Sequence, residues 1–416
     1  MNLAELTSYI DAIEAAPLEQ LMEAARPEIR ALLHKSLEGA ELTPAEGVSL
    51  YQSQGPDLRA MIKCADLARA ADNGDEVTYV VNRNINFTNI CFVNCQFCGF
   101  KRHRADADAY DHSDETILAK VADAVARGAT EVCMQGGINP EMPAFKYRDL
   151  LSVIKGRFPQ IHVHAFSPME IMYGARRVRM NYREYIGMLR DHGLGSIPGT
   201  AAEILDDDIR EILSHKKVDV AAWVEIISTA HALGVPTTST IMYGHVESAQ
   251  HVVNHLTLLR EIQKRTGGFT EFVPLRYIHF NTNLFRKGMV SPSPVGYDDF
   301  RMYAFSRLFL RGHIKNLQTS WVKLGVDLAA LTLKAGCNDF SGTLMEESIT
   351  AQAGGEAGEF IPIDLIEEKA AQMGRVAVER DTLYRKLRGK RAPNGARPIA
   401  RLESNDYHAC GRSGCG

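Results

Sequence analysis

Three cysteines lie close together in the stretch CFVNCQFCG, residues 91–99, with C-x3-C-x2-C spacing. They are Cys91, Cys95 and Cys98, and the aromatic residue Phe97 directly precedes the third. A short loop with this spacing can place three thiolates on one face of an iron–sulfur cube, so that they hold three of its four irons. Most [4Fe–4S] clusters in proteins use four cysteines. Three ligands from one loop therefore predict a cluster whose fourth iron is open to a small molecule.

Zinc is the alternative metal for the same loop. A structural zinc ion takes four ligands, and His103, a few residues downstream, would be the fourth. The spacing favours the cluster because zinc sites more commonly use two C-x2-C pairs. A chance arrangement that binds no metal is the third interpretation.

The composition is that of an ordinary globular protein of 416 residues, 45% hydrophobic and 24% charged, which can bury a large core. The formal net charge of −4 argues against a broad interface with nucleic acid or membranes. No apolar run approaches the roughly 18 residues that span a bilayer, and the N-terminus is acidic and amphipathic rather than signal-like. We therefore expect a cytoplasmic protein that binds neither nucleic acid nor membranes.

The other five of the eight cysteines do not indicate a disulfide scaffold in a chain of this length. Cys64, Cys133 and Cys337 fall in apolar or helical segments and are predicted to be small buried residues. Cys410 and Cys415 form a pair in the stretch ACGRSGCG. That pair either binds metal or oxidises, or it belongs to a terminus without a function.

The elements that must position the cysteine loop alternate between strand and helix. Residues 77–89, VTYVVNRNINFTN, are rich in β-branched and aromatic side chains and predict a strand that runs straight into the loop. A helix is predicted to begin after Ser113, a good N-cap residue, and to end at Gly128. Eight strands are expected in all, at residues 77–89, 130–135, 161–166, 195–197, 236–244, 270–275, 314–320 and 337–340.

Eight β–α units between about residues 77 and 362 suit a single (β/α)8 barrel of the TIM type. The same alternation also fits an open doubly wound sheet. We expect an N-terminal helical cap at residues 1–75, the barrel at 76–362, and a C-terminal helix and basic tail at 363–416. The segment 375–401 carries nine Lys or Arg against two acidic residues. It either contacts a partner or an anionic ligand, or it is a solvated helix and tail.

Polar residues follow nearly every expected strand, and in a barrel the chemistry gathers where these strand ends converge. From the second strand to the sixth, these residues are Gln135, Gly136 and Gly137; His162, His164, Ser167 and Glu170; Thr200 and Glu203; Tyr243, His245 and Glu247; and Arg276, His279 and Asn281. One histidine or glutamate at such a position is more often an ordinary loop residue. A series at successive strand ends predicts a shared polar site. The phosphate loop G-x-x-x-x-G-K-S/T, the G-x-S-x-G elbow and the H-E-x-x-H pair are all lacking.

Long stretches of the sequence resemble the CofH family of radical S-adenosylmethionine (SAM) enzymes. The resemblance covers about residues 75–350 and is carried by NRNINFTNICFVNCQFCGF, TEVCMQGGI, HVHAFSPMEI, GSIPGTAAEILDD, IMYGHVE, GGFTEFVPL, QTSWVKLGVDLA and GTLMEE. CofH is the tyrosine-utilising half of the machinery that makes F0, the deazaflavin chromophore of coenzyme F420. The sequence also resembles, less closely, the radical SAM enzymes MqnE and MqnC of futalosine-dependent menaquinone synthesis.

The resemblance implies a transferase that uses a [4Fe–4S] cluster and SAM. The SAM radical would abstract hydrogen from L-tyrosine, the Cα–Cβ bond would break, and the 4-hydroxybenzyl fragment would add to 5-amino-6-(D-ribitylamino)uracil. The by-products would be 2-iminoacetate, methionine and 5′-deoxyadenosine. The resemblance also implies CofG as a functional partner and a protein that supplies electrons. The alternatives are an enzyme of menaquinone synthesis with the same cofactors, and a zinc-stabilised barrel that acts as a binding protein.

The resemblance also implies residues that bind the cofactor. Phe97, beside the cluster cysteines, is one of them. By motif position, Gln135 to Gly137 correspond to the glycine-rich contact with the methionine amino group of SAM. The glutamate that usually ends that motif is Ile138 here. Glu203 matches the fourth-strand position near the ribose or methionine of SAM, and Glu247 belongs to the stretch on the adenine side.

The resemblance implies that hydrogen leaves from the amino nitrogen of tyrosine, which must then be uncharged. The site must disfavour the ammonium form, either by desolvation or by supplying a base. Tyr243, His245 and His279, at the ends of the fifth and sixth strands, are the candidates for that base. Ordinary hydrogen bonding at the barrel mouth is the alternative for each. In that case Glu170, Glu203 or a bound water would take the role.

Overall fold

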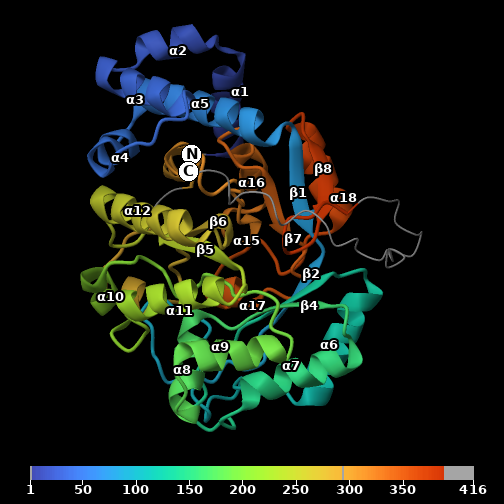
Figure 1. The fold of residues 1–416 in the computed structure, drawn as a ribbon. Helices are drawn as coiled ribbons and strands as arrows, with labels where there is room; N and C mark the ends of the chain where they lie inside the picture. Colours follow the sequence, from blue (N-terminus) through green and yellow to red (C-terminus); the bar gives the residue numbers. More distant parts are fainter. Residues whose placement is uncertain (1, 293–294, 388–416) are drawn as a thin grey trace, which may run out of the picture.

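The strands of the protein form a parallel barrel (Figure 1). The computed structural model describes residues 2–292 and 295–387. The strands are β1 (Glu76–Val80), β2 (Asn82–Ile85), β3 (Glu131–Met134), β4 (His162–Ala165), β5 (Thr237–Tyr243), β6 (Phe269–Arg276), β7 (Asp339–Gly342) and β8 (Val376–Arg380). Only Val81 separates β1 from β2, so the two are consecutive parts of one extended stretch.

The barrel closes through ladders and single bridges. β2, β3 and β4 pair in that order, β5 pairs with β6, and β7 pairs with β1, always in parallel. Isolated parallel bridges supply the other two positions: Ser196 and Ile197 join β4 to β5, and Leu317 and Gln318 join β6 to β7. The result is a closed circuit of eight strand positions, in which β1 and β2 count as one. The expected (β/α)8 barrel is confirmed, and the open doubly wound sheet is not formed.

Helices connect the strands and cover the outside of the barrel. They are α6 (Asp114–Ala126), α7 (Lys146–Arg157), α8 (Pro168–Val178), α9 (Tyr182–Asp191), α10 (Asp207–Ser214), α11 (Val220–Ala232), α12 (Ala249–Thr266), α13 (Asn283–Arg286), α14 (Tyr297–Phe309), α15 (Trp321–Leu324), α16 (Val326–Thr332), α17 (Ser348–Gln352) and α18 (Ile363–Gln372). Ser113 caps α6 as expected, because its side chain accepts a hydrogen bond from the N–H of Thr116 at 3.3 Å. None of the helices in the described part of the chain is long and apolar enough to cross a membrane.

Five helices precede the barrel and lie together at one side of it, in blue in Figure 1. They are α1 (Leu3–Ala15), α2 (Leu18–Ala24), α3 (Pro27–Leu37), α4 (Pro44–Tyr51) and α5 (Gly55–Asn73). α5 packs against α14, and α4 packs against α12. α4 begins with a capping box in which the side chains of Thr43 and Glu46 each accept the other residue's N–H. These contacts fix the helices against the outer layer of the barrel.

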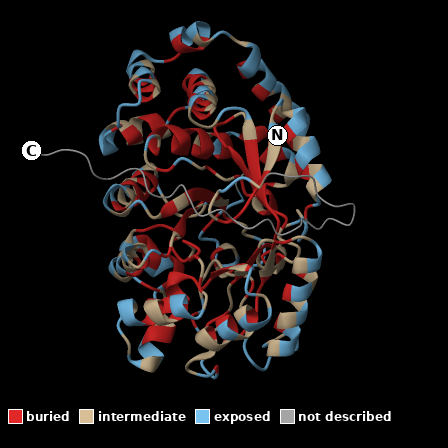
Figure 2. Cartoon of the chain, turned by 45° about the vertical axis from the view of Figure 1, so that its right-hand side comes forward, coloured by how far each residue is buried: buried red, intermediate tan, exposed pale blue. Residues whose placement is uncertain are grey.

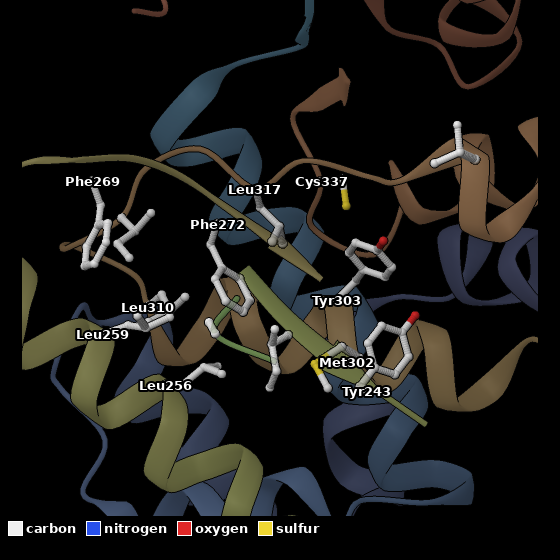
Figure 3. Packing of buried hydrophobic residues seen from close by; sticks show 14 of the residues in the cluster. Tyr243, Leu256, Leu259, Phe269, Phe272, Met302, Tyr303, Leu310, Leu317 and Cys337 are labelled. Carbon is white, nitrogen blue, oxygen red and sulfur yellow. The ribbon is translucent and has the colours of Figure 1, made fainter. Parts of the chain in front are cut away.

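The hydrophobic core lies between the strands and the helices around them. Figure 2 shows the buried residues concentrated on the strands and on the inward sides of the helices. Phe272 of β6 lies with Leu317 and with Met302 and Tyr303 of α14 in this core (Figure 3). Tyr243, the last residue of β5, belongs to the same cluster. The outward-facing side chains of the strands therefore supply the core, and the inward-facing ones are left to line the barrel.

The C-terminal segment differs from the expected solvated helix and tail. α18 is followed by β8, which pairs with β1 in a register from Glu76↔Val376 to Val80↔Arg380. Lys386 then forms an antiparallel bridge with Arg380, so residues 381–385 make a hairpin turn. The basic residues of this segment up to residue 387 pair with acidic residues of the same chain, which a charge count cannot reveal. Cys410, Cys415 and the rest of the basic tail lie outside the described residues.

Candidate active site

The cysteine loop lies at the mouth of a cavity of about 420 Å³ that extends into the barrel. Cys91, Cys95 and Cys98 all line this cavity, and each is a free thiol. Backbone hydrogen bonds hold the loop in place: the N–H of Cys91 donates to the carbonyl of Arg102 at 3.1 Å. The N–H of Gln96 donates to the carbonyl of Leu213 at 2.8 Å. The three thiols therefore face one shared space from a loop that is fixed at both ends.

The three thiols have the environment of metal ligands rather than of packing residues. Each is partly exposed to the cavity, whereas Cys64 and Cys337 are fully buried, as expected from the sequence. Burial raises the pKa of Cys95 to about 12 and also raises the pKa of Cys98, so a bound metal would displace a proton from each. The hydroxyl of Ser214 donates a hydrogen bond to Sγ of Cys95 at 3.1 Å. Soft thiolate donors of this kind suit an iron–sulfur cluster.

Two glycines after β3 allow the end of that strand to lie directly against the cysteine loop. A Cβ atom on Gly137 would stand 2.3 Å from the carbonyl oxygen of Ile90 and 3.0 Å from Cβ of Cys91. A Cβ atom on Gly136 would stand 2.6 Å from the ring of Phe87. Only glycine permits this approach without a backbone shift. Three free thiols that share one cavity with this strand end fit a [4Fe–4S] cluster with a small molecule next to it.

His103, the fourth ligand of the zinc interpretation, lies away from the cysteines. Its side chain is exposed, and its Nε2 lies 3.2 Å from Nζ of Lys101. It does not contribute to the lining of the cavity. Within residues 2–292 and 295–387, no three His, Cys, Asp or Glu side chains converge on one metal ion, as a zinc site requires. The three cysteines would each bind a different iron of a cluster.

Glu170, in the first turn of α8, reaches across to the end of β3. Its Oε1 accepts a hydrogen bond from the N–H of Gly136 at 3.0 Å, and its Oε2 accepts from both the N–H and the hydroxyl of Ser167 at 2.7 Å. Burial raises the pKa of Glu170 to about 7, and these hydrogen bonds offset only part of that rise. Ile138, which replaces the glutamate of the family motif, is buried. The carboxyl group that binds the N–H of Gly136 therefore comes from α8, the helix that follows the next strand.

We expect the raised pKa of Glu170 to make the protein less stable as pH increases. The unfolded carboxyl titrates near 4.5 and the folded one near 7, so the folded state holds the extra proton between these values. Relative to Glu170→Gln, the wild type should be most stable below about pH 4.5 and lose about 3 kcal/mol as pH rises to about 7. Chemical unfolding of both proteins across this range measures the difference. A difference that stays constant with pH would contradict the prediction.

Glu203 joins the end of the fourth strand position to the cysteine loop. Its Oε1 lies 2.5 Å from Nζ of Lys217, and its Oε2 lies 3.5 Å from a guanidinium nitrogen of Arg210. The Lys217 ammonium in turn lies 5.0 Å from the ring centroid of Phe97. The charge of Glu203 is therefore balanced within the site before any ligand binds.

Five of the six residues expected to bind the cofactor line the cavity: Phe97, Gln135, Gly136, Gly137 and Glu203. The sixth, Glu247, does not. Its carboxylate accepts hydrogen bonds from the N–H groups of Gly244 and His245 at 2.5 and 2.9 Å. It lines a separate hollow with Tyr51 and Arg301 instead. Glu247 thus closes the turn after β5 and faces away from the cysteine loop.

Tyr243, the first candidate for the base, points out of the barrel. Its hydroxyl donates to Oδ1 of Asp299 in α14 at 2.7 Å, and the residue is only 2% exposed (Figure 3). The preceding residue, Met242, lines the cavity. Because successive residues of a strand point to opposite faces, the orientation of Met242 places Tyr243 in the core.

His245 and His279, the other two candidates, also lie outside the cavity lining. Nε2 of His245 lies 3.0 Å from the carbonyl of Met242, and its Nδ1 lies 3.1 Å from the carboxylate of Glu247. The ring of His279 packs against Phe280, with 4.1 Å between ring centroids. These contacts correspond to the alternative considered for both residues, local interactions at the barrel mouth.

The inner face of the barrel carries further polar residues in line with Gln135, which was expected from its position at a strand end. They occupy alternate positions along the strands: Asn82, Asn84 and Asn86; Glu131, Cys133 and Gln135; Thr238 and Thr240; Glu271; Gln318 and Ser320. The interiors of such barrels are usually filled by branched apolar side chains. A polar residue at every second position of a buried strand was the signal available in the sequence. Cys133, predicted as a buried packing residue, is half-buried and lines the cavity.

Two family models match consecutive parts of the chain. A model of the radical SAM superfamily matches residues 85–259. A model of the CofH/MqnC C-terminal region matches residues 266–388. The first match contains the cysteine loop and strands β3 to β5, and the second contains β6 to β8.

Curated proteins match nearly the whole chain. A 5-amino-6-(D-ribitylamino)uracil–L-tyrosine 4-hydroxyphenyl transferase of Methanothermobacter thermautotrophicus is 46% identical, over 86% of this chain and 97% of that protein. An FO synthase of Streptomyces avermitilis is 46% identical over 88% of this chain, and one of Mycobacterium tuberculosis is 48% identical over 84%. The matches cover only 44% and 41% of these two FO synthases.

Solved structures resemble the fold at low sequence identity. Methylornithine synthase (PylB) aligns with a TM-score of 0.65 at 17% identity, over 83% of this chain and 97% of that protein. The FeFe-hydrogenase maturase HydG from Carboxydothermus hydrogenoformans aligns with a TM-score of 0.66 at 13% identity, over 92% and 87% of the two chains. At these identities the likeness concerns the barrel and its attached helices alone.

Proposed function

We infer the function of this chain from its family: the chain belongs to the CofH family of radical SAM enzymes. It is a transferase. We propose that it transfers the 4-hydroxybenzyl group of L-tyrosine to 5-amino-6-(D-ribitylamino)uracil, a reaction of coenzyme F0 synthesis. The observation that carries this proposal is the 46% identity to a transferase named for these two substrates, over 97% of its length.

We propose that Cys91, Cys95 and Cys98 hold three irons of a [4Fe–4S] cluster whose fourth iron binds SAM. Bound there and reduced by one electron, the cluster and SAM would supply a 5′-deoxyadenosyl radical. The protein would hold these groups in place and would balance the charges around them. Gly136 and Gly137 let the end of β3 pack directly against Phe87 and the start of the cysteine loop, and the paired charges of Glu203 and Lys217 flank the loop.

Glu170 is the residue best placed to take a proton from the tyrosine amine. Its carboxyl group lines the cavity beside Gly136, and burial raises its pKa to about 7. A base works best when its pKa lies near the pH at which the enzyme operates. Glu203 is less suited because Lys217 and Arg210 already balance its charge.

CofG and an electron-donating protein are the proposed functional partners. The matched FO synthases are more than twice as long as the region they share with this chain. The remainder of each has room for a second enzyme of similar size. We propose that a separate CofG supplies that second activity here.

The test is anaerobic reconstitution with iron and sulfide, followed by incubation with SAM, a reductant, L-tyrosine and 5-amino-6-(D-ribitylamino)uracil. We expect an adduct that carries the 4-hydroxybenzyl group, together with 5′-deoxyadenosine, both identified by mass spectrometry. Tyrosine labelled with 13C in its ring should transfer the label to the adduct. Tyrosine labelled only at the carboxyl carbon should not.

Omission of either substrate is the control, and it should remove the adduct. Formation of 5′-deoxyadenosine without any labelled adduct, when both substrates are present, would contradict the proposed acceptor. An adduct labelled from the tyrosine carboxyl carbon would contradict cleavage between Cα and Cβ.

A further inference from the structure

The cavity continues past the proposed SAM site to a polar end deep in the barrel. We define this deep polar end by Glu131, His164, Glu271, Gln318, Arg380 and Thr382, all of which line the cavity. Glu131 precedes Gln135 by four residues on the same inner face, so it lies about 13 Å farther along the strand from the cysteine loop. The steps proposed above use only residues near the loop. The deep polar end is a second chemical environment in the same cavity.

Two buried carboxylates contribute to this end from different sides of the barrel. Glu131 begins β3, and its Oε1 accepts a hydrogen bond from Nδ2 of Asn82 at 2.8 Å. Glu271 lies in β6, and its Oε2 accepts from Nε2 of Gln318 at 2.9 Å and from the hydroxyl of Tyr384. The hydrogen bonds found within the described residues therefore use one oxygen of each carboxylate. A carboxylate has about four acceptor positions, so both side chains keep acceptor capacity for a ligand.

Two further polar groups lie beside these carboxylates. The Thr382 hydroxyl neighbours Glu131 but makes no hydrogen bond of normal geometry with any described residue, although the residue is only 7% exposed. The Nδ1 of His164 lies 2.6 Å from the hydroxyl of Ser196, which leaves Nε2 for the cavity. Burial lowers the pKa of His164 to about 4, so its ring is neutral at pH 7. A buried hydroxyl without a partner is costly, and a ligand that completes its hydrogen bond removes that cost.

We propose that the deep polar end binds the ribityl chain of 5-amino-6-(D-ribitylamino)uracil, with ribityl hydroxyls donating hydrogen bonds to Glu131 and Glu271. This inference rests on the proposed function. It assigns the ribityl chain of the acceptor to the deep polar end and the uracil ring to the end of the cavity near the cysteine loop. The hydroxyphenyl fragment arises near the cysteine loop, so the diaminouracil ring that receives it must lie toward that loop. The saturated polyol chain is the remote part of the acceptor and extends away from the loop.

The chemistry of the deep polar end matches a polyol better than it matches the other groups present. A hydroxyl both donates and accepts, so one chain can donate to the carboxylates and also pair with Thr382 and with the neutral His164. The guanidinium of Arg380 is already held by both carboxylate oxygens of Asp339, at 2.5 and 3.0 Å. It therefore balances charge at the deep polar end, which forms the floor of the barrel, and has little capacity left for the carboxylate of tyrosine.

The test compares two uracils that differ only in the ribityl chain. Anaerobic calorimetry on the reconstituted holoenzyme measures the affinity for 5-amino-6-(D-ribitylamino)uracil and for 5,6-diaminouracil. Glu131→Gln should weaken binding of the ribityl compound by about 10- to 100-fold, because a hydrogen bond to a charged group is lost. Thr382→Val should weaken it by about 2- to 10-fold. Neither change should alter the affinity for 5,6-diaminouracil or for tyrosine.

Glu346→Gln is the matched control. Its carboxylate pairs with Arg83 and Lys120 outside the cavity, so both affinities should stay at the wild-type value. Thermal unfolding of each variant shows whether it is folded. If Glu131→Gln does not fold, Thr382→Val carries the test.

Three outcomes would overturn the ribityl site. They are equal wild-type affinity for the two uracils, equal loss for both uracils in the variants, and loss of tyrosine binding instead. Because binding is measured directly, the test does not require product. Tight ribityl-dependent binding without adduct would overturn the proposed function and leave the site standing.

Discussion

Replacing Cys95 with alanine is expected to abolish formation of 5′-deoxyadenosine and of the adduct. Cys95 lies between the other two thiols in the loop and accepts a hydrogen bond from Ser214. In the proposed cluster, its loss would leave one iron without a protein ligand. Cys91→Ala and Cys98→Ala should have the same effect. Iron and sulfide content after reconstitution, together with visible absorbance, measures the cluster independently of activity.

Cys64→Ala and Cys337→Ala are the matched controls, because both thiols are fully buried away from the cavity. They should keep the iron content of the wild type and lose only packing, about 1 kcal/mol for a small buried side chain. If Cys337→Ala lost the cluster while Cys95→Ala kept it, the assignment of ligands would be wrong.

Arg380→Met is expected to destabilise the fold more than any other change considered. Arg380 and Asp339 form a buried pair with two hydrogen bonds, and their side chains are 3% and 0% exposed. Removing the guanidinium leaves the Asp339 carboxylate uncompensated in the barrel floor. Breaking a buried pair in this way costs about 3–5 kcal/mol. Chemical unfolding of the variant and the wild type measures the loss.

Arg190→Met is the control, because it makes the same substitution in an exposed ion pair. Arg190 and Asp191 are 44% and 63% exposed, and such pairs contribute less than about 1 kcal/mol. The double variant Arg380→Met, Asp339→Leu should recover part of the stability, because the charge of Asp339 is then no longer left without a partner and only the Glu271 contact remains lost. Equal, small losses for Arg380→Met and Arg190→Met would show that the Arg380 pair does not support the floor.

The sequence predicts the barrel well because its elements are marked locally. A strand such as TTSTIMY has the β-branched content of a buried strand, and Ser113 marks the start of α6 by a capping side chain. The two shortest strand positions, at Ser196–Ile197 and Leu317–Gln318, become visible because strands on both sides require them. The strand and capping signals are local, whereas the two short positions depend on strands more distant in the chain.

The sequence predicts the site less completely, because a position at a strand end does not show whether the side chain points into the barrel or out of it. Met242 and Tyr243 are neighbours, yet one lines the cavity and the other packs against α14. Choosing Tyr243 for its hydroxyl ignored the parity that assigns Thr238, Thr240 and Met242 to the inner face. Applying that parity to every strand would have found Glu131 and Glu271 from the sequence.

The sequence does not predict β8 and the contacts of Arg380, for a different reason. β8 is a five-residue strand in a segment dominated by basic residues, and nothing near it shows what it will pair with. The partners of Arg380 are Asp339 and Glu271, which precede it by 41 and 109 residues. Contacts at such separations leave no periodic pattern in the sequence around either partner.

The pairing of β8 with β1 sets an order of events during synthesis on the ribosome. Arg375 and Asp75, which pair at the start of this ladder, are 300 residues apart. At the usual rates of translation, roughly 15 to 60 s pass between the emergence of β1 and that of β8. Throughout that interval β1 has an unpaired edge, which is the part of a sheet most prone to pair with another chain. The nascent chain therefore keeps an unpaired strand edge until β8 emerges, and a chaperone that covers strand edges would act in that interval.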